Sequence, residues 1–311
     1  MVLPQNGGKV ASIKCIRTGT EFLLPGSQYD KVAEYGSQAL FEVSDCAGWD
    51  ECLPTVSLSG PDTPGGSAPD HGDFWRIPWT LCDIPSANEI CIEASGNSRP
   101  LSLRKRITLN STELHIQYSI TNLSAIPLGF LYASHPLLCI NPGDRILLPS
   151  EVSSLKLIES RGLRIGKNGD KVSWPIHFHN GVSFDLRRVG TATEGAAEML
   201  YTNRLKRGSA GLYRTQIGQG LIFGFDTTAL PYLGLWTSYG GWPESSVGCS
   251  PQYAIALEPT TAPHGSLYDA SRTSKERTLG GAEIFSFSLR LGIFGCENRI
   301  TYAQFQEEFD H

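Results

Sequence analysis

Apolar and polar residues alternate along several stretches of the chain with the period of two that is typical of β-strands. The alternation covers residues 107–109 and 114–123, and it returns at 221–225 and at 284–291. Successive side chains of a strand point to opposite faces of its sheet, so one face would pack on a core and the other would meet water. These stretches are therefore predicted to form antiparallel sheets.

Helical periodicity is limited to a clear segment at 302–309 and a weaker one at 196–204. The 33 glycines and 19 prolines are spread along the chain, which is typical of many short strands joined by turns. Neither a composition shift nor an internal repeat divides the sequence. We expect a single all-β domain over residues 1–311, a large antiparallel β-sandwich in which two sheets pack face to face, with few short helices.

Charge and composition exclude several classes of partner. With 26 basic and 31 acidic residues the net charge is −5, which disfavours a nucleic-acid partner. No apolar run approaches the roughly 20 residues of a membrane span, and the polar segment 1–8 does not resemble a signal peptide. Eight cysteines without a Cys-x-x-Cys pair indicate buried free thiols in a reducing compartment. A cytoplasmic protein is therefore expected.

Glu258 is the first candidate for acid–base chemistry. It ends the strand-like run 253–257 and precedes Pro259. Glutamate is rarely buried without a partner, so this carboxylate would either be solvated at a sheet edge or be held in a cavity for a chemical purpose. The turn-rich segment that follows would fix the path of the chain after the strand. The solvated carboxylate and the functional carboxylate both remain open interpretations.

Two histidines are the next candidates. His135 lies in an apolar strand-like segment before a proline, where it would be either a hydrogen-bonded core residue or a general acid that titrates near neutrality. His71 lies in a loop with Asp73 and Arg76. These three side chains would either stabilise a tight turn or bind the hydroxyl groups of a ligand.

Trp236 and Trp242 bracket a short segment of small and polar residues. Indole rings stack on the apolar face of a pyranose, although core packing is as common for any single tryptophan. His177 and His179 share one strand face, but no cysteine or acidic residue accompanies them at zinc-binding spacing. The chain contains neither a nucleophile elbow nor a dinucleotide- or phosphate-binding loop. We therefore predict no metal and no cofactor.

The order of His71-Gly72, His135-Pro136 and Glu258-Pro259 resembles that of the motifs in the galactose mutarotase-like superfamily, which includes the aldose 1-epimerases. Segments 48–55 and 113–134 also resemble this family, and the resemblance covers roughly residues 10–295. It implies a large antiparallel β-sandwich with the site on a concave face. It further implies a small-molecule sugar as partner, with Glu258 as general base and His135 as general acid.

The resemblance also implies that His71 and Arg76 bind hydroxyl groups or the ring oxygen, although their spacing is longer than in the epimerases. Glu51 lies where sugar-phosphate mutarotases have an arginine, which favours a non-phosphorylated sugar. The aspartate that galactose mutarotases use to recognise hydroxyl groups has no secure counterpart. The further candidates for substrate binding are Glu51, Asp73, Trp236 and Asp226.

These residue types suit the interconversion of sugar anomers, in which one group removes a proton from the C1 hydroxyl and another protonates the ring oxygen. The predicted function is a cofactor-independent aldose 1-epimerase-like enzyme for a free, non-phosphorylated sugar. One alternative is a non-catalytic carbohydrate-binding protein. Another is a glycoside-processing enzyme, in which Glu258 and either Glu51 or Asp73 would flank the scissile bond.

Overall fold

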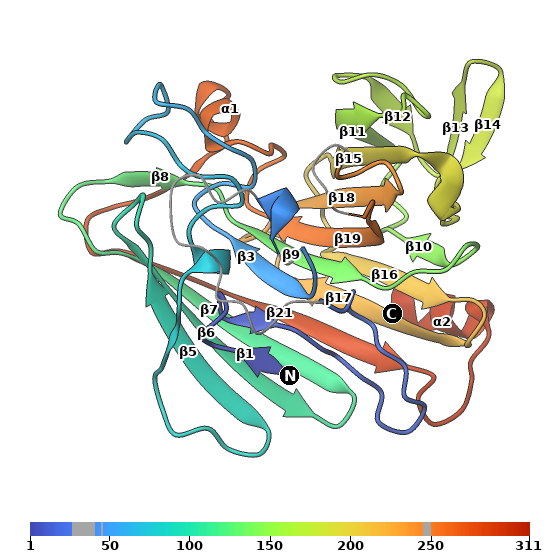
Figure 1. Ribbon diagram of the computed structural model, residues 1–311, viewed down its shortest axis with the longest axis horizontal. Coiled ribbons are helices and arrows are strands. Elements are labelled where there is room, and N and C mark those ends of the chain that lie inside the picture. The colour runs from blue at the N-terminus through green and yellow to red at the C-terminus, as the bar shows by residue number, and fades with distance from the viewer. Residues whose placement is uncertain (27–40, 45, 245–249) are drawn as a thin grey trace.

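The computed structural model describes residues 1–26, 41–44, 46–244 and 250–311. The larger of its two main sheets has nine antiparallel strands (Figure 1). Their order across the sheet is β1 (Val2–Leu3), β2 (Lys9–Val10), β3 (Trp49–Cys52), β9 (Ala133–Leu138), β19 (Tyr253–Thr260), β18 (Tyr232–Tyr239), β15 (Ala196–Thr202), β11 (Ser154–Arg161) and β12 (Lys171–Ser173).

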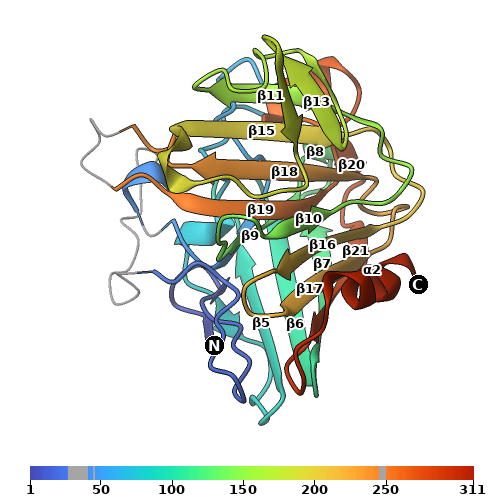
Figure 2. The same cartoon turned by 90° about the vertical axis from the view of Figure 1, so that its right-hand side faces the viewer.

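The second main sheet has eight antiparallel strands. Their order is β10 (Arg145–Leu147), β16 (Ser209–Arg214), β17 (Gln219–Phe225), β21 (Ile284–Phe294), β7 (Glu113–Asn122), β6 (Leu101–Asn110), β5 (Glu89–Ser95) and β4 (Thr80–Leu81). In Figure 2, β15, β18 and β19 of the first sheet run across the view, whereas β5 and β6 of the second run down it. The two sheets pack face to face, so the predicted antiparallel β-sandwich is confirmed.

The remaining elements are short. Two small two-stranded sheets pair β13 (Ile176–His179) with β14 (Val182–Asp185) and β8 (Leu128–Phe130) with β20 (Arg277–Leu279). The helices are α1 (Leu267–Arg272), α2 (Tyr302–Asp310) and the single-turn 3-10 helices η1 (Phe41–Val43), η2 (Phe74–Arg76) and η3 (Ala192–Glu194). Within the described part of the chain, no helix has the length and apolar character that crossing a membrane requires.

The alternating stretches of the sequence are strands β6, β7, β17 and β21, as predicted, and the predicted C-terminal helix is α2. The helix predicted at 196–204 is wrong, because this segment forms strand β15. Every residue of β15 is buried, so the segment lacks the polar alternation of a half-exposed strand. Of the cysteines, Cys249 lies outside the described residues and the other seven are free thiols.

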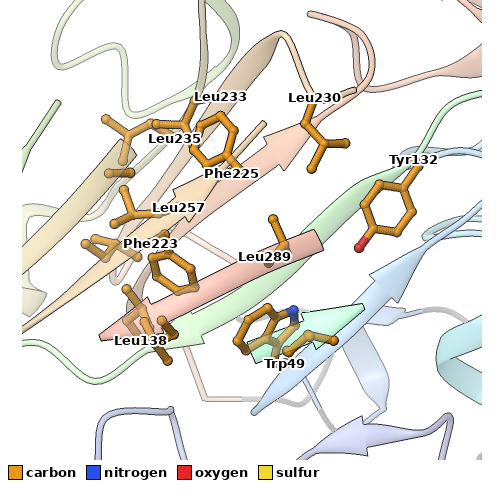
Figure 3. Packing of buried hydrophobic residues seen from close by; sticks show 14 of the residues in the cluster. Trp49, Tyr132, Leu138, Phe223, Phe225, Leu230, Leu233, Leu235, Leu257 and Leu289 are labelled. Carbon is orange, nitrogen blue, oxygen red and sulfur yellow. The ribbon is translucent and has the colours of Figure 1, made fainter. Parts of the chain in front are cut away.

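The main hydrophobic core lies between the two sheets. Figure 3 shows Leu138, Leu235 and Leu257 of the nine-stranded sheet close to Phe223 and Leu289 of the eight-stranded sheet. Because side chains alternate along a strand, the neighbours of these leucines point to the opposite face of the nine-stranded sheet. That face is also covered, since β9, β15, β18 and almost all of β19 are buried along their whole length.

Candidate functional site

A cavity of about 640 Å³ lies on the face of the nine-stranded sheet that is turned away from the eight-stranded sheet. Five neighbouring strands and several loops line it. The strands contribute His135, Leu137, Ile158, Glu159, Arg161, Met199, Tyr201, Trp236 and Glu258. The loops and η1 contribute Phe41, Glu42, Val56, Ser57, Leu58, Asp70, His71, Trp242, Gln252 and Gly265.

Glu258 and His135 lie side by side in this cavity. The cross-strand pairs Ala256–Leu137 and Thr260–Ala133 bracket them, so the register of β19 and β9 places the two residues opposite each other. Opposed residues share a sheet face, and here His135 Nε2 is 3.6 Å from Glu258 Oε1. Only 1% of Glu258 and 5% of His135 is exposed. The structure thus brings together the two residues predicted to transfer protons.

Burial changes the proton affinity of both groups in the direction that keeps each of them neutral. It raises the pKa of Glu258 from 4.5 to about 8. Burial, with smaller effects of the His71 and Lys9 charges, lowers the pKa of His135 well below its usual 6.5. A carboxyl group taken out of water favours its protonated form, and an imidazole favours its unprotonated form. Both shifts favour the neutral pair at neutral pH, with the shared proton on Glu258 rather than on His135.

His71 forms the wall of the cavity next to His135. The two imidazole rings are 5.2 Å apart at nearly a right angle, and Phe41 stacks on His71 at 3.7 Å. His71 Nδ1 is 2.9 Å from Asp70 Oδ2, which leaves Nε2 for a ligand. Burial opposes ionisation of Asp70, but the charge and hydrogen bond of His71 outweigh it and lower the pKa of that carboxyl.

The loop that carries His71 is held by a close backbone contact. His71 and Gly72 both adopt positive φ angles, of 56° and 71°. A Cβ on Gly72 would lie 2.0 Å from the Leu53 carbonyl oxygen, so only glycine fits at this position. The turn of the predicted motif is therefore structural, and it fixes the direction of the neighbouring imidazole.

Two tryptophans form an aromatic wall. Trp236 and Trp242 both line the cavity and meet edge to face, with ring centroids 5.8 Å apart. Trp236 Nε1 donates to Gln252 Oε1 at 3.2 Å, which holds the indole in place. An apolar ring face beside polar side chains is suited to a pyranose. Trp236 thus lines the cavity, and its contact with a sugar stays a prediction.

Glu51 does not line the cavity, in contrast to its predicted role. It is fully buried between the sheets, where Oε1 accepts from Lys105 Nζ at 3.0 Å and from the Tyr118 hydroxyl at 2.9 Å. Oε2 accepts from the Tyr132 hydroxyl at 2.6 Å. Glu51 is two residues after Trp49 on β3, so the two side chains point to the same face of the sheet, which is the core face. Its carboxylate is thus part of the core.

Asp73 and Arg76 also lie outside the cavity lining. Asp73 Oδ2 accepts from the backbone amides of Asn97 and Ser98 and from the Ser98 hydroxyl, at 2.8–3.0 Å. This carboxylate therefore ties the loop to the turn after β5. Arg76 is 7% exposed, and its guanidinium carbon is 5.9 Å from the centre of the Trp75 ring. Both residues support the loop that carries His71, and their predicted contacts with the substrate are not supported.

Asp226 is exposed in the turn after β17, a strand of the eight-stranded sheet, and is not part of the described cavity lining. It accepts from the Thr228 amide at 2.8 Å and from the Thr228 hydroxyl at 2.6 Å. The hydrogen bonds from Thr228 lower the pKa of this carboxyl. Asp226 stabilises its own turn, so its prediction as a sugar-binding residue is corrected.

No family model and no curated protein sequence matches this chain. Solved structures do match. The chain is similar to the Slr1438 protein from Synechocystis sp. PCC 6803, with 16% identity, 94% of this chain and 90% of that protein covered, and a TM-score of 0.67. It is similar to a candidate aldose 1-epimerase from Escherichia coli K12, with 19% identity, 93% of each chain covered and a TM-score of 0.64.

A galactose mutarotase-like protein from Lactobacillus casei ATCC 334 is similar as well, with 15% identity, 93% of this chain and 95% of that protein covered, and a TM-score of 0.64. The chain has the galactose mutarotase-like fold. The TM-scores of 0.64–0.67 show a shared fold, and at identities of 15–19% they show the fold alone, so the reaction has to be inferred from the cavity itself.

In this mutarotase-like fold, sequence reasoning missed several cavity residues. Tyr201 is the most notable, because it lies on β15, the segment predicted to be a helix. With the period of a strand, Met199 and Tyr201 would have been assigned to the same face as Ala197. Arg161 and Gln252 come from segments without a distinctive motif. Only the tertiary structure brings them to the cavity.

Proposed function

We propose that this protein is a cofactor-independent aldose 1-epimerase-like enzyme that interconverts the anomers of a free, non-phosphorylated sugar. The observation that carries the proposal is the pair of Glu258 and His135, whose proton-transferring atoms lie 3.6 Å apart in a cavity with an indole wall. A volume of about 640 Å³ is in the usual range for small-molecule sites. The mutarotase-like fold agrees with this function and does not by itself imply it.

The reaction needs one proton acceptor and one proton donor on the same sugar. Glu258 accepts the proton of the C1 hydroxyl while His135 protonates the ring oxygen, and the bond between C1 and the ring oxygen breaks. Rotation about the C1–C2 bond presents the other face of the aldehyde. Ring closure then returns both protons, so the dyad ends with the proton count with which it began. Each positioned group contributes roughly 10²–10⁴-fold to such a rate.

The resting proton on Glu258 is compatible with these roles. The dyad shares one proton, which lies on Glu258 in the neutral pair and on His135 in the ion pair. Both arrangements have the same number of protons, so a titration does not distinguish them. A sugar hydroxyl that donates to the Glu258 carboxylate favours its ionised form and lowers its pKa. Substrate binding thereby transfers the proton toward His135, the arrangement from which the proposed first step begins.

The rate is predicted to depend on pH as a bell-shaped curve, because the active dyad holds one proton. For the free enzyme kcat/KM should fall above a pKa of about 8, where Glu258 loses the proton. It should fall again in acid, at a pKa below the usual 6.5 of histidine, where His135 gains a second one. The measurement is exchange NMR of anomer interconversion across pH, with the spontaneous rate subtracted. A rate that stays constant through pH 8 would contradict the assignment.

The charges at the cavity favour an uncharged substrate. Arg161 is the only lysine or arginine among the described lining residues. Its guanidinium is bonded to Glu159 at 2.8 Å and lies 3.7 Å from Glu244. Glu42 and Asp70 add further carboxyl groups to the lining. A sugar phosphate would meet a surplus of carboxylates there.

A free aldose is therefore predicted to be turned over with a kcat/KM at least about tenfold higher than that of its 6-phosphate ester, because like charges in contact cost several kcal/mol. The measurement compares glucose with glucose 6-phosphate, and galactose with its ester, by exchange NMR at two salt concentrations. Preference for the ester would overturn the charge argument while leaving the reaction type intact.

Two other functions predict different results in the same experiment. The two carboxylates suggested as partners of Glu258 in a glycosidase, Glu51 and Asp73, lie outside the cavity lining, so that alternative has lost its support. A carbohydrate-binding protein would broaden the signals of a sugar without accelerating its anomer exchange. Acceleration of a free sugar by the wild type is the result that supports the proposed enzyme.

Free thiols at the seven described cysteines support the expected cytoplasmic location.

A further inference from the structure

Tyr201 lies in the same cross-strand row as Glu258. On the three neighbouring strands β15, β18 and β19, Tyr201 is opposite Gly234, and Gly234 is opposite Glu258. Residues directly opposite each other point to the same face of a sheet. The backbones of Tyr201 and Glu258 are thus separated by two strand spacings, about 10 Å, and the residue between them has no side chain.

The missing side chain allows the tyrosine ring to approach the carboxylate. A Cβ on Gly234 would lie 3.1 Å from Tyr201 Cε1 and 3.2 Å from Glu258 Oε2. The ring edge and the carboxylate thus both lie close to the place that a Cβ of Gly234 would take, where Met199 Cε is nearer still, at 2.7 Å. Both side chains line the cavity.

The hydroxyl group of Tyr201 and the Oε2 atom of Glu258 are buried, and among the described residues neither has a hydrogen-bond partner. Leaving a buried polar atom unpaired costs about 1–3 kcal/mol, so such atoms call for an explanation. Burial, and secondarily the charge of Glu258, raises the pKa of Tyr201 well above its usual value. Its hydroxyl thus keeps its proton and remains a donor. A ligand hydroxyl can accept from Tyr201 and donate to Glu258, which satisfies both atoms.

We propose that Tyr201 donates a hydrogen bond to the anomeric hydroxyl, O1, of the sugar whose proton Glu258 removes. This inference rests on the proposed function, since it assigns O1 to the Glu258 side of the dyad. As the proton passes from O1 to Glu258, negative charge develops on O1 and the hydrogen bond from Tyr201 becomes stronger. The O–H bond of Tyr201 does not break, and Tyr201 loses no proton in either direction of the reaction.

Packing alone does not require the hydroxyl group. The ring of Tyr201 belongs to an apolar cluster with Met199 and Trp236, and a phenylalanine would fill the same space. Tyr201→Phe therefore removes the donor and keeps the packing. Tyr253→Phe is the matched control, because the Tyr253 hydroxyl donates to the Gly190 carbonyl at 2.7 Å and Tyr253 is not part of the described cavity lining.

The test compares two ligands that differ at O1. The probes are D-glucose and D-galactose, each paired with its 1,5-anhydro derivative, which lacks O1 and cannot open. Dissociation constants are measured by NMR titration for wild type, Tyr201→Phe and Tyr253→Phe. Tyr201→Phe is expected to weaken binding of the aldose about 3–10-fold, the value of one hydrogen bond, and to leave binding of the anhydro sugar unchanged. Where the wild type turns the aldose over, kcat/KM should fall by at least about tenfold.

Equal losses for the aldose and its anhydro derivative, or no loss for either, would overturn the assignment of Tyr201 to O1. This comparison uses binding, so it decides the role of Tyr201 even if the wild type accelerates no sugar. That second result would overturn the proposed function alone. Tyr253→Phe should bind both ligands like the wild type, and all three proteins should have similar thermal unfolding midpoints. The weaker binding of Tyr201→Phe would then result from the lost hydrogen bond and not from a disturbed sheet.

Discussion

Replacing Glu258 by glutamine is expected to lower kcat/KM for anomer interconversion by about 10²–10⁴-fold, the contribution of one positioned proton-transfer group. Glutamine has nearly the same size but neither accepts nor releases a proton. Exchange NMR with the sugar that the wild type accelerates most gives the rate. Glu93→Gln is the matched control, because Glu93 lies on β5 of the other sheet in a half-exposed ion pair with Arg104. A rate unchanged in Glu258→Gln would exclude Glu258 from the chemistry.

The free energy of unfolding of Glu258→Gln should increase relative to that of the wild type as the pH rises. Such a result would also show that its lost activity does not result from unfolding. The pKa of Glu258 is about 8 in the folded protein, against an ordinary value of 4.5. Between these values the folded state binds a proton that the unfolded state has released, so wild-type stability falls with increasing pH. Glutamine does not titrate. Denaturation at about pH 5 and pH 8.5 should therefore show its advantage growing by a few kcal/mol.

The sandwich could be predicted from the sequence where strands have one exposed face. Strand β7 is an example, because Ile116, Tyr118 and Ile120 face the core while intervening residues are more exposed. Strand β15 could not be recognised this way. The cavity elements cover one of its faces and the second sheet covers the other, so it contains no regular polar positions. Its burial depends on residues far away in the sequence.

A place in the cavity could be predicted for three residues that belong to short motifs, while their chemical roles stay predictions. Glu258, His135 and His71 each directly precede a proline or a glycine, and all three line the cavity. Pro136 and Pro259 lie inside strands β9 and β19, whereas Gly72 belongs to a turn. The predictions for Glu51 and Asp73 failed, because a carboxylate near a motif can equally well be neutralised inside the protein. Which face of β3 contains Glu51 depends on the register of β3 with β9, which the sequence alone does not reveal.

Glu51→Gln is expected to destabilise the protein by about 3–5 kcal/mol, the cost of removing one charge from a buried ion pair. The ammonium group of Lys105 would then keep a hydrogen bond to the Gly8 carbonyl and its place 5.2 Å from the Trp79 ring, with no carboxylate beside it. Both partners are fully buried, so water cannot compensate. The measurement is urea denaturation of Glu51→Gln, with the free energy of unfolding extrapolated to water.

The double variant Glu51→Gln/Lys105→Met distinguishes this core function from the sugar-binding role that the sequence suggested. Removing both charges leaves no unpaired ion, so the double variant should be more stable than Glu51→Gln, and the cycle of single and double variants gives the coupling energy. The KM of folded Glu51→Gln should equal that of the wild type, because the Glu51 carboxylate lies between the sheets, on the far side of β3 from the cavity. A raised KM with unchanged stability would return Glu51 to the site. A lowered stability with unchanged KM would show that this carboxylate holds the two sheets together beneath the cavity.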